Sequence, residues 1–423
     1  MSKEDLKLKI EVEKLAKIFV EIGDSRYSTL IRHSTSVANI FYYLIKQLKL
    51  DYESWRIYFT GLFHDITLLM IAILNDYEKA TAFIREEPDI EQIVLEFDGR
   101  NKHSFLGSYF LKSIDFPEDY QKMLVYHHTS LKRVSESDRN LILAVNSIQL
   151  ADRISIELLK DKSQDKGAMV KKIVAKYTAC GEITPEVKEI LEKEDISEAM
   201  NMELHWDFDD VSFDLNQSVQ FVKGIAFLLD AKSPYTRNHS TIVSKVSSEI
   251  AFRMMSETDA KVIELAALLH DIGKFKVPLK ILHKKEALTE DEWEIMKGHV
   301  NDTYQMLSRS GLTTIAKIAA AHHERIDGTG YPSGLSMEHL NLYARILQVA
   351  DIYSALIEER PYRSKMTPEK AIELLGELVE EDKLDVRVVH YLKRMVSEKN
   401  KHLFCDYYDT LEEFLGVRYE KLI

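Results

Sequence analysis

Histidine and aspartate recur in the same order in the two halves of the chain, and this repeat constrains the fold more than any other feature. The first-half members are His33, His64, Asp65, His103, His127, His128 and Asp152. The second-half members are His239, His270, Asp271, His299, His322, His323 and Asp351. Corresponding members lie 195 to 206 positions apart, since 322 − 127 is 195 and 239 − 33 is 206. A repeat of roughly 200 residues is too long for a solenoid unit and predicts two homologous domains.

Apolar residues around these positions are spaced as in amphipathic or buried helices. In the second half these stretches are 262–269, 314–323 and 342–357, and in the first half 55–74, 119–128 and 140–159. Glycine and proline are scarce, at 15 and 8 of 423 residues, which suits a helical chain. We therefore predict an all-α, mainly helical protein made of two homologous helical domains in tandem.

The join between the domains is expected near residues 200–216. This stretch is acidic, lacks helical periodicity and alternates enough to form a short strand pair. The predicted domains are 1–205 and 206–423.

Charge and cysteine content exclude several classes of protein. With 56 basic and 69 acidic residues the formal charge is −13, which argues against general nucleic-acid or membrane-surface binding. The two cysteines, Cys180 and Cys405, are too far apart for a CxxC motif, so a reducing cytoplasmic location is expected. No apolar stretch reaches the ~18–20 residues of a membrane span. The oligomeric state is left open by the sequence.

The repeated residue types are those of a metal centre. Imidazole nitrogens and carboxylate oxygens without sulfur suit Fe, Mn, Co, Ni or Zn. A carboxylate such as Asp271 can bridge two cations, and two metals about 3.5–4 Å apart can clamp a phosphate. The seven second-half residues are therefore candidate ligands of two divalent ions, and the seven first-half residues are candidates for a second metal site.

The ordered set H…HD…H…HH…D resembles the HD superfamily of metal-dependent phosphohydrolases, and the second half resembles its HD-GYP branch. Residues 270–274 read HDIGK, 322–332 read HHERIDGTGYP, and 349–363 read VADIYSALIEERPYR. The likeness covers about residues 220–395, and the whole chain is similar to a tandem HD plus HD-GYP phosphodiesterase. It implies hydrolysis of second messengers, cyclic di-GMP or 3′,3′-cyclic GMP-AMP, to linear 5′-phosphorylated dinucleotides and, after a second cut, mononucleotides.

The resemblance also implies residue roles. The first metal would be held by His239, His270, Asp271 and Asp351. The second would be held by Asp271, His299, His322 and His323, with iron or manganese typical of the family. The catalytic residues would be Asp271 and Lys274, with Lys274 contacting a phosphate oxygen, and further substrate contacts would come from Tyr331, Arg360 and Arg363.

Two positions depart from the family pattern. Members with a third metal have Glu where this chain has Tyr235, so a two-metal centre is expected here. Ser354 replaces the usual Asp, which puts in doubt how the segment around Arg360 is braced.

The first half lacks the GYP loop of the second half and the basic side chains proposed to contact substrate there. Leu68, Asp161 and Gln164 stand at the positions of Lys274, Arg360 and Arg363. The first half is therefore expected to bind metal with weak or no dinucleotide cleavage, as a sensor, regulator or packing partner. The alternatives are a second phosphohydrolase with other substrates and a domain that has lost its metal.

Three other functions stay open at this point. They are a nucleotide phosphohydrolase of the general HD type, a di-iron oxygenase, and a cyclic dinucleotide receptor without catalysis. An oxygenase requires oxygen for turnover, and a receptor binds its ligand without releasing product. The sequence does not choose between the two cyclic dinucleotides or between the metals.

Overall fold

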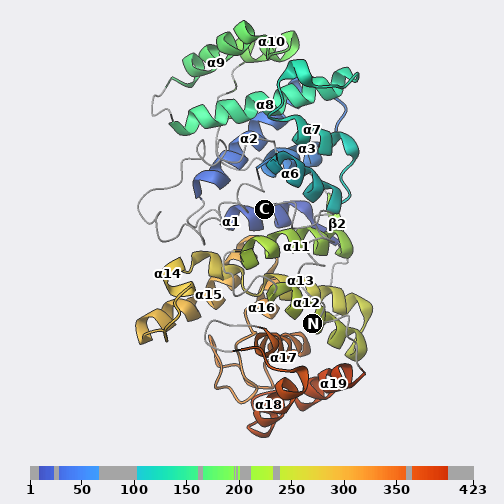
Figure 1. Ribbon diagram of the computed structural model, residues 1–423, viewed down its shortest axis with the longest axis vertical. Helices are drawn as coiled ribbons and strands as arrows, with labels where there is room; N and C mark the ends of the chain where they lie inside the picture. Colours follow the sequence, from blue (N-terminus) through green and yellow to red (C-terminus); the bar gives the residue numbers. More distant parts are fainter. Residues whose placement is uncertain are drawn as a thin grey trace. The chain divides into compact units, whose positions relative to one another are not determined.

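The computed structural model describes residues 9–22, 28–65, 102–160, 165–194, 196, 199–200, 211–231, 239–358 and 364–398. These residues form mainly helices, with one two-stranded sheet (Figure 1). The predicted helical fold class is thereby confirmed. Within these ranges, no helix combines the length and apolar character needed to cross a bilayer.

The chain divides into two compact units, here called the N-unit and the C-unit. The N-unit contains α2 (Ser28–Gln47), α3 (Ser54–Leu62), α6 (Lys102–Ser113), α7 (Glu118–Tyr126), η3 (Leu131–Arg133), α8 (Arg139–Lys160), α9 (Lys166–Cys180) and α10 (Pro185–Lys193). The C-unit contains β1 (Lys9–Glu11), α1 (Val12–Ile22), β2 (Ser212–Asp214), α11 (Leu215–Ala231), α12 (His239–Met254), α13 (Glu257–Leu269), η4 (Ile272–Lys276), α14 (Leu279–Leu282), α15 (Glu290–Arg309), α16 (Thr313–Ala319), α17 (Leu342–Ile357), α18 (Pro368–Glu380) and α19 (Val386–Ser397).

The C-unit takes in a segment from the start of the chain, which differs from the predicted division at 205/206. Strand β1 pairs antiparallel with β2, with Ile10 opposite Phe213. Helix α1 then packs against α11 and α15, with Leu15 and Phe19 buried. A strand is thus present at the predicted join, but its partner is about 200 positions away. The apolar face of α1 needs a covering surface, and α11 and α15 supply it.

Helix α13 lies at the centre of the C-unit and packs against α11, α12 and α16. It is buried along most of its length, and Ala266 and Ala267 let neighbouring helices approach closely. The Ser256 side chain accepts the Asp259 N–H and starts the helix. The helix ends at Leu269, so His270 and Asp271 lie in the turn that leaves it.

Two capped helices carry further residues of the repeat. A capping box between Thr289 and Glu292 starts α15, which carries His299. The Asn341 side chain accepts the Ala344 N–H and starts α17, whose bounds coincide with the predicted 342–357. Helix α16 ends at residue 319, so the histidine pair at 322–323 lies in the following turn and not on a helix as predicted.

In the N-unit, α2 packs against α3 and α8, and α7 packs against α3 and α8. The predicted helix at 140–159 falls within α8, and that at 119–128 is α7 followed by a turn. Residues 66–74 of the helix predicted at 55–74 lie outside the described residues. Most of the predicted join, residues 201–210, and the end of the chain, residues 399–423, also lie outside them.

Candidate metal centre

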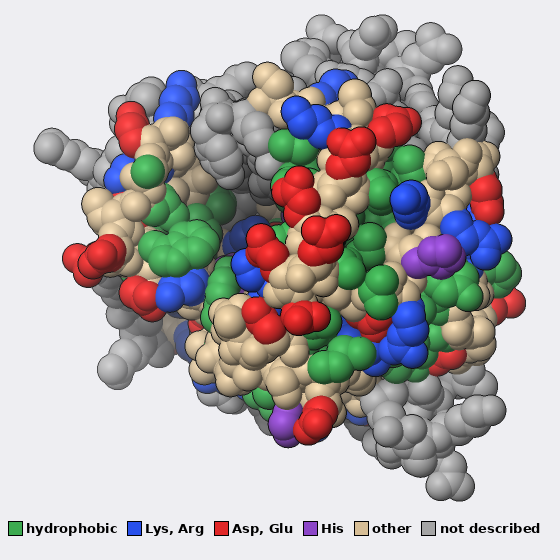
Figure 2. Space-filling view, turned by 90° about the horizontal axis from the view of Figure 1, so that it is seen from below, with side chains coloured by type: hydrophobic (Ala, Val, Ile, Leu, Met, Phe, Trp, Pro, Cys, Tyr) green, Lys and Arg blue, Asp and Glu red, His purple; other side chains and the backbone are tan. Residues whose placement is uncertain are grey.

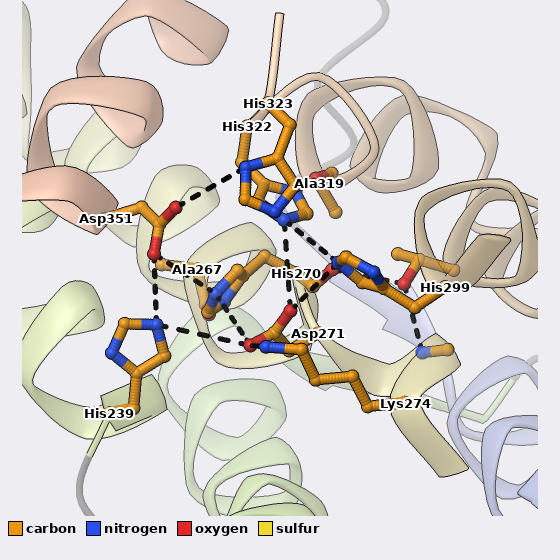
Figure 3. Close-up of polar contacts among 12 residues, drawn as sticks. His239, Ala267, His270, Asp271, Lys274, His299, Ala319, His322, His323 and Asp351 are labelled. Atoms are coloured by element: carbon orange, nitrogen blue, oxygen red, sulfur yellow. Dashed lines mark hydrogen bonds and ion pairs between the residues drawn. The ribbon is translucent and has the colours of Figure 1, made fainter. Parts of the chain in front are cut away.

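The seven second-half residues of the repeat meet in one buried cluster of the C-unit (Figure 3). They come from five parts of the fold: the start of α12, the turn after α13, the middle of α15, the turn after α16, and the middle of α17. In that order they are His239, His270 with Asp271, His299, His322 with His323, and Asp351.

One half of the cluster surrounds the Oδ2 atom of Asp271 and the Oδ1 atom of Asp351. His270 Nε2 lies 3.3 Å from Asp271 Oδ2 and 3.8 Å from Asp351 Oδ1. His239 Nε2 lies 2.9 Å from Asp351 Oδ1 and 4.0 Å from Asp271 Oδ2. One ligand atom each from His239, His270 and Asp271 fall within 4.8 Å of one another, which is close enough for a shared cation.

The other half surrounds the second oxygen of Asp271. His299 Nε2 lies 3.3 Å and His322 Nε2 3.8 Å from Asp271 Oδ1. His323 Nδ1 lies 3.9 Å from Asp351 Oδ2, and the three histidines also form a group within 4.8 Å. Asp271 therefore faces both groups, one with each carboxylate oxygen.

Hydrogen bonds to the backbone fix which nitrogen of each imidazole faces the cluster. Three Nδ1–H groups donate to the carbonyl three positions earlier: His270 to Ala267 at 2.7 Å, His299 to Met296 at 2.6 Å and His322 to Ala319 at 2.7 Å. In the neutral form their Nε2 atoms then carry lone pairs. His299 Nε2 and His322 Nε2 are only 3.4 Å apart, so two lone pairs face each other. A metal ion between the groups removes this repulsion, and the donor set fits one.

The charges of the cluster point the same way. Burial would raise the pKa of Asp271, but His270 and Lys274 hold it well below its usual range. Burial would lower the pKa of His239, but Glu358 and Asp351 raise it to about 10. His239 likewise holds the pKa of the buried Asp351 well below its usual range. The carboxylates of Asp271 and Asp351 thus stay ionised and favour positive charge between them.

The opposite side of the cluster favours neutral imidazoles. Burial lowers the pKa of His323 to about 3, and burial with the neighbouring His323 and His270 holds the pKa of His322 well below its usual range. Neutral imidazole is the form that binds a metal.

The turn after α13 is pressed against α15 at Gly273. A Cβ on Gly273 would lie 2.0 Å from the backbone oxygen of His299, so only glycine allows this approach. Thr303 on α15 accepts the Gly273 N–H at 3.0 Å and donates to the His270 carbonyl at 3.1 Å. These contacts hold His270 and His299 in one place.

Lys274 lies beside Asp271, on the 3-10 helix η4 that follows it. In a 3-10 helix side chains three positions apart are eclipsed. The Lys274 Nζ atom lies 2.5 Å from Asp271 Oδ2 and is partly exposed, so a cation stands at the edge of the cluster.

Tyr331 also lies at the cluster. Its N–H donates to the His323 carbonyl at 3.1 Å, and the two rings are 4.8 Å apart between centroids and inclined at 31°. The buried carboxylate of Glu324 accepts the N–H groups of Ser333 and Leu335, both at 2.8 Å, and so holds the loop.

Three further residues near the cluster were not identified from the sequence. The Glu358 carboxylate lies 2.9 Å from His239 Nδ1. The Trp293 ring, 46% exposed on α15, lies 6.4 Å from the Tyr331 ring. Arg325 is half-buried; burial lowers the pKa of its guanidinium, and the charges of Asp351 and Tyr331 oppose this shift. Their only sequence signal is proximity to the motifs, which does not reveal which side chain turns inward.

The first-half residues form a second cluster, in the N-unit. The structure brings six of them together: His33, His64, Asp65, His127, His128 and Asp152. His103 lies on α6, and its side chain is outside what the structure describes. Also outside the described residues are Leu68, Asp161, Gln164, Tyr235, Arg360 and Arg363.

Residues 225–388 match the family model of the HD domain, and residues 10–130 match that of the HDOD domain. The HD-domain match spans the C-unit cluster, and the first half matches an HDOD domain where the sequence predicted an HD domain.

Several curated relatives match part of the chain. The 3′3′-cGAMP-specific phosphodiesterase 3 of Vibrio cholerae is 44% identical over 36% of this chain, and phosphodiesterase 1 of the same name is 29% identical over 70%. The cyclic di-GMP phosphodiesterase of Thermotoga maritima is 37% identical over 40% of this chain. The alignments span 33%, 74% and 49% of these relatives, respectively.

A solved structure shares the fold along most of the chain. The crystal structure of the cyclic GMP-AMP phosphodiesterase V-cGAP3 of V. cholerae aligns with a TM-score of 0.55 and 22% identity. The alignment covers 93% of this chain and 99% of the solved chain. The tandem helical arrangement is therefore a known fold.

Proposed function

We propose that this chain, whose residues 225–388 match the HD domain model, is a metal-dependent phosphodiesterase that opens cyclic dinucleotides. The observation that carries the proposal is the arrangement of two histidine groups on the two oxygens of Asp271, with Lys274 beside them. The names of the relatives supply the substrate class, cyclic di-GMP or 3′3′-cyclic GMP-AMP.

The residues of the C-unit cluster divide into two ligand sets that share Asp271. His239, His270 and Asp351 complete the first set, and His299, His322 and His323 complete the second. Iron or manganese suits this nitrogen and oxygen donor set. When bound, a pair of such cations supplies activation of water and neutralisation of phosphate charge.

The chain's own residues place the substrate. Lys274 offers its ammonium to a non-bridging phosphate oxygen, where it offsets the charge that builds up as the P–O bond breaks. Asp271 orients that ammonium through its contact with Nζ. Attack by water on phosphorus expels the ribose 3′-oxygen and gives a linear 5′-phosphorylated dinucleotide.

The surroundings suit flat bases joined by charged phosphates. The exposed Trp293 ring and the half-buried Tyr331 ring lie next to each other, and Lys297 Nζ lies 6.0 Å from the Tyr331 centroid. Aromatic rings stack on nucleobases and cations pair with phosphate. On the face shown in Figure 2, a hollow left of centre has hydrophobic side chains on its left and charged side chains of both signs around it.

The test is a substrate panel on the full chain loaded with Fe(II) or Mn(II). Cyclic di-GMP, 3′3′-cyclic GMP-AMP, linear dinucleotides and nucleoside triphosphates are incubated with and without oxygen, and the products are resolved by chromatography. We expect linear dinucleotides from at least one ring without oxygen. Turnover of triphosphates alone would indicate a general nucleotide phosphohydrolase, oxygen-dependent turnover an oxygenase, and binding without product a receptor.

Replacing Trp293 with alanine is expected to raise KM for the cyclic dinucleotide about 10-fold with little change in kcat, because one base–aromatic stack is worth about 1–3 kcal/mol. Steady-state kinetics measures both. Ile295→Ala is the matched control, since Ile295 is equally exposed on α15 but about 200° around the helix. Equal effects of the two substitutions would remove Trp293 from the binding site.

Replacing Glu358 with glutamine is expected to weaken metal binding about 10–100-fold, because a carboxylate on the outer nitrogen orients a ligating imidazole and makes it more basic. Competition with a chelator measures the affinity. Glu381→Gln, which removes a surface ion pair with Lys383, is the control. Unchanged affinity in Glu358→Gln would mean that His239 needs no such partner.

A further inference from the structure

A second cluster of histidines and aspartates lies in the N-unit, on helices and turns that contribute nothing to the proposed catalytic residues. We propose that it holds a first-row divalent metal ion in a closed site, which stabilises the N-unit and takes no substrate. This inference stands on the N-unit residues alone and does not depend on the proposed phosphodiesterase activity.

Asp65 is the centre of the N-unit cluster. His64 Nε2 lies 3.3 Å and His33 Nε2 3.6 Å from Asp65 Oδ2, and His127 Nε2 lies 3.6 Å from Asp65 Oδ1. Ligand atoms of His33, His64 and Asp65 form one group within 4.8 Å, and those of Asp65, His127 and His128 form another. The three ligand atoms of each group are close enough together to bind one metal ion, and nearby side chains can supply further ligands.

The proton positions in this cluster leave lone pairs facing one another. His64 Nδ1–H donates to the Gly61 carbonyl at 2.8 Å. The Ser155 hydroxyl donates to the His33 carbonyl, so His33 Nδ1–H donates to the Ser155 oxygen at 2.9 Å. The two Nε2 atoms lie 3.3 Å apart, and when both imidazoles are neutral they direct lone pairs at each other. A cation bound to both nitrogens makes this arrangement favourable.

Asp152 adds an unsatisfied buried charge. Its side chain is 1% exposed, and neither carboxylate oxygen accepts a hydrogen bond from the described residues. The oxygens lie 3.3 Å from His33 Nε2, 3.7 Å from His128 Nδ1 and 3.8 Å from Arg153 Nε. Arg153 supplies one positive charge for the two buried carboxylates of Asp65 and Asp152, so the cluster favours a further positive charge, which a bound metal ion would supply.

The N-unit cluster is more closed than that of the C-unit. The His128 side chain is 4% exposed against 26% for His323, and Asp152 is 1% exposed against 10% for Asp351. Structural metal sites are closed by protein ligands, whereas catalytic sites keep a position open to water or substrate. The nitrogen and oxygen donors, without sulfur, suit iron, manganese or zinc.

Metal content of four full-length proteins tests the inference: wild type, Asp65→Ala, Asp271→Ala and the double variant. Each is reconstituted with Fe(II), Mn(II) or Zn(II), freed of excess metal and analysed for bound metal, with circular dichroism as the check on folding. We expect Asp271→Ala to keep metal that the double variant lacks. Equal metal content in wild type and Asp65→Ala, or a metal-free, folded Asp271→Ala protein, would overturn the proposal and leave a cluster neutralised by protons.

Thermal unfolding of Asp271→Ala separates a metal site from a merely structural cluster. A chelator is expected to lower its transition temperature but to leave that of the double variant unchanged. Asn146→Ala, which breaks buried hydrogen bonds of α8 to Thr184 and Glu182, controls for destabilisation without loss of a ligand and should keep the metal. Turnover of a nucleotide that metal-loaded Asp271→Ala shows and the double variant lacks would contradict the closed site.

Discussion

Replacing Asp271 with alanine is expected to lower hydrolysis of cyclic dinucleotides by at least about 10³-fold and to release the metal of the C-unit. The reason is geometric, because one oxygen of Asp271 lies 3.3 Å from His270 and the other 3.3 Å from His299. The substitution therefore removes one ligand from each of the two proposed sets. Product chromatography and metal analysis on the same sample measure both effects.

The control for this substitution is Asp302→Ala. Asp302 lies on α15 like His299, but its carboxylate pairs with Lys276 at 3.3 Å and is partly exposed. Its loss should leave turnover and metal content close to those of wild type. Wild-type turnover by a folded Asp271→Ala protein would show that the cluster is not the site of hydrolysis.

Replacing Lys274 with alanine is expected to lower kcat about 10²-fold while the metal content stays that of wild type. Removal of a single positive group that stabilises transition-state charge typically costs 10²–10³ in rate. Lys274 contacts Asp271 through its ammonium group, and this positively charged group does not itself bind a metal ion. Loss of rate without loss of metal therefore distinguishes a substrate contact from support of the metal centre.

Two further variants sharpen that test. Lys274→Arg keeps the positive charge and should recover part of the rate. Lys276→Ala removes a nearby lysine whose ammonium forms an ion pair with Asp302, and it should change the rate little. If Lys274→Ala loses metal in step with activity, Lys274 acts by holding Asp271 and not by contacting substrate.

The helices that carry the C-unit cluster could be predicted closely where a periodic apolar pattern meets a cap. Residues 342–357 form a helix with the predicted bounds because Asn341 caps its start. The turn after α16 was harder to predict from the sequence. The pattern at 314–323 continues as in a helix, yet the helix ends at residue 319, and the His322 ring is held by the Ala319 carbonyl.

The features that were missed depend on contacts between distant residues. Strand β1 pairs with β2 across about 200 positions, so no local pattern shows that the start of the chain belongs to the C-unit. Glu358 reaches His239 across 119 positions, and the Trp293 ring meets Tyr331 only because α15 packs beside the loop that follows α16. Such partners are chosen by helix packing, which a single sequence does not display.

The sequence by itself determined the donor atoms, their order and their repetition, because nitrogen and oxygen ligands are properties of side-chain types. Only the tertiary structure decided which nitrogen of each imidazole faces a neighbour and how open each cluster is to solvent. The physical reason is that these properties depend on distances of a few ångströms between elements far apart in the chain. Close approaches such as that of Gly273 to the His299 carbonyl set those distances.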